Sequence, residues 1–265
     1  MADSIARRNF ITSSIILAAA AGAGTAAAPA TGKKQEFYEL RVYRVKNRDK
    51  QKLVSGYLEK ALVPGLNRLG INRVGVFTLM ESADDPALFM LIPYPTLEHF
   101  AGLNPKLEAD SAYMAASKDF LAEPKEDPAF QRIESKFFKA FSGMPVIELP
   151  AQTRAKKARI FELRTYESHN PERAARKVEM FNTGETQVMR EAEMAPVFFG
   201  EALIGADVPE LTYMLSADNM AAHEEHWKAF QAHPEWNRMK GLAKYKDTVS
   251  KITKWFLVPT AYSQI

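Results

Sequence analysis

The sequence of 265 residues contains no cysteine, which excludes disulfides and a cysteine nucleophile. It also lacks a Gly-rich phosphate loop and a Gly-x-Ser-x-Gly elbow, so the commonest nucleotide-binding and hydrolase routes are excluded. The formal net charge is only +3, which gives no reason to expect a nucleic-acid partner. With 46% apolar and 25% charged residues, the composition is that of a soluble globular protein held by its core.

The first 30 residues indicate an export signal rather than a part of the fold. Arg7 and Arg8 precede Phe10 and a weakly apolar run, and the small residues Ala28 and Ala30 suit a signal peptidase. This pattern resembles a twin-arginine signal. A membrane anchor is the rival interpretation, but ten Ala or Gly residues make the run too weakly hydrophobic for a stable one. We therefore expect cleavage and a periplasmic or extracellular protein without a stable membrane anchor.

The rest of the chain contains a repeat, because the segment 161–166 (FELRTY) echoes the segment 38–43 (YELRVY). Each copy opens the same predicted order of strand, helix, strand, strand, helix, strand. The predicted strands are 37–45, 73–80, 87–92 and 133–141, then 159–166, 197–204, 211–215 and 251–258. The predicted helices are 53–69, in which Pro64 indicates a kink, 97–103, 107–121, 170–189, 219–230 and one that begins at 234.

This order, taken twice, predicts an α+β protein of two tandem ferredoxin-like (βαββαβ) repeats. We expect the modules at residues 31–141 and 159–265, with a linker at 142–158 marked by Gly143, Pro145 and Pro150. Four antiparallel strands with both helices on one face leave the other face open. Two halves can therefore press their open faces together as a pseudo-symmetric α/β barrel of eight strands. Two independent domains on a flexible linker are the alternative.

Four motifs of the second half have the order and spacing of a known family: FELRTY at 161–166, HWKAF at 226–230, HPEW at 233–236 and FLVPT at 256–260. They resemble the NIPSNAP family of the dimeric α/β-barrel group, although His233 stands where that family usually has Asp. The resemblance implies the barrel fold but no activity, because the family has no agreed one. Related barrel families include haem-degrading monooxygenases, so haem is a candidate cofactor by analogy alone.

The repeated strand carries polar residues that we predict to bind a ligand. Side chains alternate along a strand, so the polar residues of each copy share one face, which we expect to point into the barrel while the apolar face packs on the helices. Two interpretations stay open: the arginines and tyrosines orient an anionic or phenolic ligand, or the charges form ion pairs that fix how the halves mate. The residues concerned are Glu39, Arg41 and Tyr43 in the first half and Glu162, Arg164 and Tyr166 in the second.

A helix of the second half adds His226 and Trp227, and His99 stands at the corresponding place in the first half. We predict these three as further ligand-binding residues, with His226 or His99 as a ligand or base. His223 and His226 share a helix face, but their spacing is not that of zinc proteases, and we predict no metal site. No residue is assigned a catalytic role.

Three functions follow from these observations. The first is a protein that binds a small anionic or aromatic molecule inside the barrel. The second is a haem-handling or monooxygenase-like enzyme that uses the same cavity. The third is a structural or partner-binding protein with a filled barrel. Both halves lie in one chain, so the dimer that single-module relatives need is already internal, and we expect a monomer or a homodimer.

Overall fold

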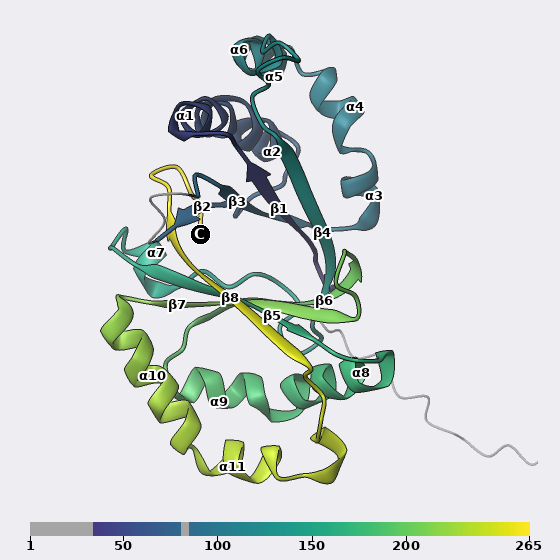
Figure 1. Ribbon diagram of the computed structural model, residues 1–265, viewed down its shortest axis with the longest axis vertical. Helices are drawn as coiled ribbons and strands as arrows, with labels where there is room; N and C mark the ends of the chain where they lie inside the picture. The colour runs from purple at the N-terminus through teal and green to yellow at the C-terminus, as the bar shows by residue number, and fades with distance from the viewer. Residues whose placement is uncertain (1–33, 81–84) are drawn as a thin grey trace, which may run out of the picture. The chain divides into compact units, whose positions relative to one another are not determined.

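The computed structural model describes residues 34–80 and 85–265 (Figure 1). The predicted export signal at residues 1–30 lies outside the described residues. All eight predicted strands are found with bounds close to those expected. They are β1 (Phe37–Arg44), β2 (Gly75–Leu79), β3 (Leu88–Tyr94), β4 (Arg132–Ala140), β5 (Ile160–Glu167), β6 (Pro196–Ile204), β7 (Glu210–Ala217) and β8 (Lys251–Pro259).

The strands form one closed antiparallel barrel in the order β1-β3-β2-β8-β5-β7-β6-β4. Each half contributes four consecutive strands of this ring in the ferredoxin-like order. The halves join where β2 pairs with β8 and where β4 pairs with β6. This confirms the predicted α+β barrel of two fused repeats, and the alternative of two independent domains is wrong.

The helices form two sets, one on the outer side of each half (Figure 1). The first set comprises α1 (Arg48–Tyr57), the π-helical turn η1 (Leu58–Leu62), α2 (Val63–Arg68), α3 (Leu97–Ala101), α4 (Leu103–Glu108), α5 (Ser111–Ala116) and α6 (Lys118–Leu121). The second comprises α8 (Pro171–Met180), the π-helical turn η2 (Phe181–Glu185), α9 (Thr186–Glu191), α10 (Met220–Ala232), α11 (Pro234–Lys240) and the short η3 (Ala243–Tyr245). No helix in the described part of the chain is long and apolar enough to cross a membrane.

The first long helix of each half has the same construction. Asn47 and Asn170 cap the two helices, and each side chain accepts a hydrogen bond from a backbone N–H in the first turn. A π-helical turn then interrupts each helix at the same distance from its cap. Pro64 follows the first of these turns, but the second has no proline, so the turn belongs to the repeat and not to Pro64 alone.

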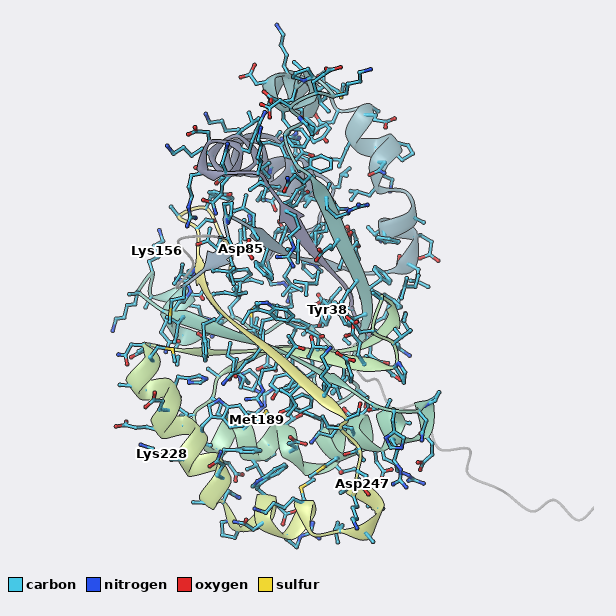
Figure 2. The ribbon with its side chains drawn as sticks, in the orientation of Figure 1. Tyr38, Asp85, Lys156, Met189, Lys228 and Asp247 are labelled. Carbon is cyan, nitrogen blue, oxygen red and sulfur yellow. The ribbon has the colours of Figure 1, made fainter. Side chains whose placement is uncertain are left out.

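Apolar side chains from all eight strands fill the barrel. Ile147 of the linker, which also contains α7 (Ala151–Arg154), and the last residue, Ile265, pack into the same cluster. A cavity of about 50 Å³ beside Trp255 remains, which is too small for an organic ligand. The largest buried side chains of this cluster are Tyr38 (labelled in Figure 2), Phe77, Phe89, Phe138, Phe161 and Phe198.

The period-two division of the repeated strands is right, but the prediction that the polar face points into the barrel is wrong. Leu40 and Leu163 lie in the barrel cluster. Tyr43 and Tyr166 instead pack with helix residues in two separate clusters outside it. The barrel interior is shared by two sheets and sealed from water, so it takes the apolar side chains. The helix side offers hydrogen-bonding partners, and buried charges need such partners.

Candidate functional site

A cleft of about 410 Å³ lies in the second half, between the outer face of strands β5 and β8 and helix α10. It lies outside the barrel interior. Lys228, labelled on α10 in Figure 2, belongs to its helical wall. The lining residues are Glu162, Arg164, His223, Glu224, Trp227, Lys228, Gln231 and Lys254.

Local sequence patterns place these side chains together. Asn219 caps α10 by accepting from the N–H of Ala222, and the helical wall is built from positions three or four residues apart, which share one face. On the sheet side, Glu162 and Arg164 are two residues apart on β5, so their side chains point to the same face of the strand. Lys254 on β8 is paired directly with Arg164.

Glu162 forms the floor of the cleft and is only 1% exposed. One carboxylate oxygen accepts from Nη1 of Arg164 at 3.1 Å, and the other accepts from Nε2 of His223 and Nε1 of Trp227, each at 2.8 Å. The network assigns the His223 proton to Nε2, because that nitrogen faces a carboxylate. Burial disfavours the charged carboxyl, but the His223 hydrogen bond, the Arg164 charge and the Trp227 hydrogen bond together lower the pKa of Glu162. Glu162 is therefore ionised and accepts three hydrogen bonds.

Arg164 stands between two aromatic rings, and its side chain is 15% exposed. Its Cζ lies 4.4 Å from the ring centroid of Trp227 and 5.4 Å from that of Tyr166, which are cation–π contacts. Among the described residues, Glu162 is the only hydrogen-bond acceptor for this guanidinium. Its Nε atom is buried and has no acceptor in this part of the chain. An unmatched buried donor on a charged group is costly, and its burial closes this atom to molecules in the cleft.

The cleft has an excess of positive charge near this wall. Arg164 and Lys254 are directly opposite each other on adjacent strands, and like charges so placed destabilise a sheet. Within residues 34–80 and 85–265, neither Lys254 nor Lys228 forms an ion pair. Glu224 on the helix is the other carboxylate of the lining. Since Glu162 is occupied by three donors, the cleft suits an anion.

The first half has the same repeated strand, but different side chains surround its Glu–Arg pair. Glu39 accepts from Nε of Arg41 at 2.5 Å, from the Tyr94 hydroxyl at 2.9 Å and from the Ser135 hydroxyl at 2.7 Å. Ser135 is paired with Arg41, at the position where the second half has Lys254. Three donors from the strands themselves therefore satisfy Glu39, and none comes from a histidine or tryptophan.

Aromatic packing covers this face of the first half. The ring of Phe100 lies 4.3 Å from that of Phe137 and 5.5 Å from that of Tyr94. Both halves thus keep a buried Glu–Arg pair, but only the second half places a histidine, a tryptophan and an extra lysine beside it. The two repeats therefore differ at this face, which aromatic side chains cover in the first half and which holds a polar cleft in the second.

The nine predicted ligand-binding residues do not share one cavity. Glu162, Arg164 and Trp227 come together in the cleft, and Tyr166 lies behind them with its hydroxyl 2.8 Å from that of Tyr213. His226 does not line the cleft. The other four lie in the first half and are Glu39, Arg41, Tyr43 and His99, the last with its Nδ1 2.9 Å from the Thr96 hydroxyl.

Sequence reasoning missed five of the eight lining residues, and His223 and Lys254 are the two on which the site most depends. His223 was noted only as a partner of His226, yet it shares a helix face with Trp227 at a spacing of one turn, and this signal could have favoured it. Lys254 can be placed in the cleft only from the register between β5 and β8, which no sequence pattern specified.

Haem does not fit the donors of this cleft. An axial ligand would be an imidazole nitrogen open to the cleft. Nε2 of His223 donates to Glu162, and its Nδ1 is buried. Nδ1 of His226 is also buried, and His226 lies outside the lining. We therefore derive no chemistry through haem.

These features define an α/β barrel of two fused ferredoxin-like halves, with one half carrying a polar cleft. Residues 161–264 match the NIPSNAP family, and this half of the chain is a NIPSNAP domain. The strands and helix that form the cleft all lie in that domain.

Two solved structures are similar in fold over most of the chain. A candidate monooxygenase from Lactobacillus acidophilus NCFM is similar with a TM-score of 0.58 and 11% identity, over 85% of this chain and 94% of that chain. A candidate monooxygenase from Fusobacterium nucleatum subsp. nucleatum has a TM-score of 0.52 and 10% identity, over 85% and 93%. A NIPSNAP-like domain protein from Burkholderia xenovorans aligns with 40% of this chain and 88% of its own, at 16% identity and a TM-score of 0.36. No curated protein matches the sequence.

Proposed function

We propose that the protein binds a small organic anion in the cleft between β5, β8 and α10. The observation that carries this proposal is the pair of cations on the sheet wall, because Arg164 and Lys254 lie directly opposite each other on adjacent strands. Glu162 carries a single negative charge and forms its ion pair with Arg164, whereas Lys254 has no ion-pair partner in the described part of the chain. An anion at this point would reduce the repulsion between the two cations.

Binding is favoured over the other two functions that the sequence left open. A filled barrel agrees with a structural role for the interior, but it leaves the cleft unexplained. The two similar monooxygenase structures are only 10% and 11% identical to this chain. They support its fold and assign no reaction to it. The candidate bases His226 and His99 do not line the cleft, and His223, which does, has one ring nitrogen engaged and the other buried, so no observation favours a catalytic role.

The test is isothermal titration of the purified protein with benzoate as a probe anion. We expect saturable binding that weakens as salt is added, because the lysines of the cleft are exposed. The double variant Lys228→Gln/Lys254→Gln should bind roughly two- to thirtyfold more weakly, since each exposed charge contributes about 0.2–1 kcal/mol. The matched control is Lys52→Gln/Lys125→Gln, which removes two exposed lysines of the first half.

The proposal fails if the wild type binds no benzoate. It also fails if the two double variants lose affinity equally, because the anion would then respond to net charge rather than to the cleft.

We also propose, from the sequence, that residues 1–30 direct export through a twin-arginine route. Arg7 and Arg8 support this, with the Ala- and Gly-rich run that follows them. Cell fractionation and N-terminal sequencing of the recovered protein test it. We expect an exported chain shortened near Ala30, and the variant Arg7→Lys/Arg8→Lys should stay in the cytoplasm. A full-length wild-type chain in the cytoplasm would contradict the proposal.

A further inference from the structure

The seam between β4 and β6 is shorter than β4 itself. β4 pairs with β1 along nearly its whole length, from Arg132 to Lys139, but it pairs with β6 only from Phe137 to Ala140. Before Phe137, no strand of residues 34–80 and 85–265 pairs with the other side of β4. The residues from Arg132 to Ser135 are all exposed. This stretch is therefore an open strand edge at one end of the barrel.

The backbone groups of Ile133 and Ser135 point to the open side of this edge. The N–H of Ala140 bonds to the carbonyl of Glu36 on the β1 side. Backbone direction alternates along a strand, and the register with β1 is regular, so the even-numbered residues of β4 bond to β1. The N–H and C=O groups of Ile133 and Ser135 are thus available to an added strand.

Exposed apolar side chains lie on this edge and beside it. Ile204 is paired with Phe137 at the last position of the β4–β6 ladder, where the open edge begins. The side chain of Ile204 is 65% exposed, and Leu203 and Val208 of the same hairpin are 47% and 49% exposed. Ile133 on the edge itself is 37% exposed. Exposed apolar groups of this kind mark interaction surfaces.

The charges of the open edge complement those of a second copy. A second β4 can pair antiparallel with this edge about a two-fold axis that passes between Ile133 and Ile133 of the partner subunit. Arg132 then lies opposite Glu134 of the partner subunit, and the symmetry repeats this contact. Glu134 already accepts from Arg44 at 3.0 and 3.1 Å, whereas Arg132 forms no ion pair in the described part of the chain. Opposite charges placed across a strand pair stabilise it.

Other two-fold registers are disfavoured. An axis at Arg132 or at Glu134 would place like charges directly opposite each other, which destabilises a strand pair. An axis at Ser135 would place the partner's strand beside Phe137, and β6 already occupies that position. The edge therefore fits a second copy with Ile133 at the axis.

We infer that the protein forms a two-fold homodimer through the open edge of β4, with Ile133 at the axis. The partner's strand runs towards the β6–β7 hairpin, so the exposed Leu203, Ile204 and Val208 of that hairpin contact the partner subunit. The edge is short, and we expect a reversible dimer that is half-formed at about 1–100 µM. The inference is independent of the proposed anion site, which lies between β5, β8 and α10.

Sedimentation velocity of the purified protein from about 1 to 200 µM tests the inference. We expect the wild type to dimerise as its concentration rises. Ile133→Pro removes an N–H that points to the open side and leaves the bonds to β1 intact, so this variant should keep the far-UV circular dichroism of the wild type and stay monomeric. Arg154→Glu changes the charge of an exposed arginine on α7, away from the edge, and should dimerise like the wild type.

Charge exchange tests the register. Arg132→Glu should weaken the dimer roughly four- to several-hundredfold, because two symmetry-related contacts change from attraction to repulsion. Glu134→Lys should weaken it similarly. An equal mixture of the two variants should dimerise again, because Glu at 132 of one chain then lies opposite Lys at 134 of the other, and the second contact keeps the wild-type pair.

The results separate the edge from its register. A wild type that stays monomeric up to about 200 µM overturns the inference. So does a dimer that survives in folded Ile133→Pro or in Arg132→Glu, because the interface would then lie elsewhere. A mixture that stays as monomeric as its components overturns the register with Ile133 at the axis. Arg132→Glu alters only an exposed side chain, so the inference stays testable even if Ile133→Pro does not fold.

Discussion

The second half contains a buried ion pair that the first half replaces with apolar residues, and this difference yields a quantitative prediction. Nζ of Lys177 lies 2.6 Å from a carboxylate oxygen of Glu185 in the π-helical turn, and the two side chains are 6% and 2% exposed. At the same distances from the helix cap, the first half has Val54 and Leu62, both buried. The repeat thus supplies a natural apolar substitute for the pair.

Removing one partner should be costly. Lys177→Val or Glu185→Leu alone leaves a buried charge uncompensated, which costs about 3–5 kcal/mol. For a chain of this size, that corresponds to a fall of roughly 6–20 °C in the melting temperature.

The double variant Lys177→Val/Glu185→Leu should behave differently. Apolar replacement of a buried pair often stabilises by about 1–4 kcal/mol. The contacts of Lys177 with Tyr166, Phe181 and Trp236, at 5.6, 4.9 and 5.4 Å, are lost with it, at about 1–2 kcal/mol in total. We therefore expect the double variant to lie between about 1 kcal/mol less stable and about 3 kcal/mol more stable than the wild type.

The pH dependence of the single variants adds a second test. Burial raises the pKa of Glu185, against the lowering effect of the Lys177 charge. A carboxyl with a raised pKa favours the folded state at low pH and loses that contribution as pH rises through its folded-state pKa. Without Lys177 this effect grows, so the cost of Lys177→Val should increase as pH rises above the ordinary glutamate value of 4.5.

Urea unfolding of the four proteins measures these free energies, with equal m values as the check that unfolding stays two-state. Single variants that cost less than about 1 kcal/mol would refute the reasoning. So would a double variant as unstable as the sum of the singles, because the two positions would then not be coupled.

Two further predictions follow from the floor of the cleft and from the barrel wall. The pKa of Glu162 is lowered, so its contribution to stability is present above the usual value of 4.5 and is lost as pH falls through the lowered pKa. The destabilisation by Glu162→Gln, measured by urea unfolding from neutral pH down to about pH 3, should therefore shrink on acidification, and a constant difference would contradict this. A Cβ on Gly200 would lie 2.7 Å from Cβ of the buried Phe138, so Gly200→Ala should cost about 1–3 kcal/mol. Gly56 in α1 has nothing within 4 Å of such an atom, so Gly56→Ala should stabilise by roughly 0.5–1 kcal/mol, and equal effects at the two sites would argue against this packing.

The sequence allowed the barrel to be predicted because its signals are local and repeated. Alternation along the strands and the two copies of the Glu-x-Arg-x-Tyr strand gave the element order, and that order has few ways to close. The predicted helix at 107–121 was less accurate, since α5 and α6 are separate short helices there. The spacing of apolar residues does not show where a short loop separates two helices.

The site was harder to predict because it depends on which face of a strand points into the barrel interior, where water is excluded. Alternation shows that Glu162 and Leu163 point in opposite directions, but it does not show which direction leads into the barrel. That choice depends on how tightly two sheets and the linker residue Ile147 exclude water, which is a property of the whole fold. The pairing of Arg164 with Lys254 likewise depends on the register of strands far apart in the sequence.

The position of a bound carboxylate tests the account most directly. A crystal of the protein with 4-bromobenzoate would locate the bromine by anomalous scattering. We predict one bromine site in the cleft between β5, β8 and α10, with the carboxylate near Lys254 and Arg164. A bromine site inside the barrel, or beside Arg41 in the first half, would contradict the account.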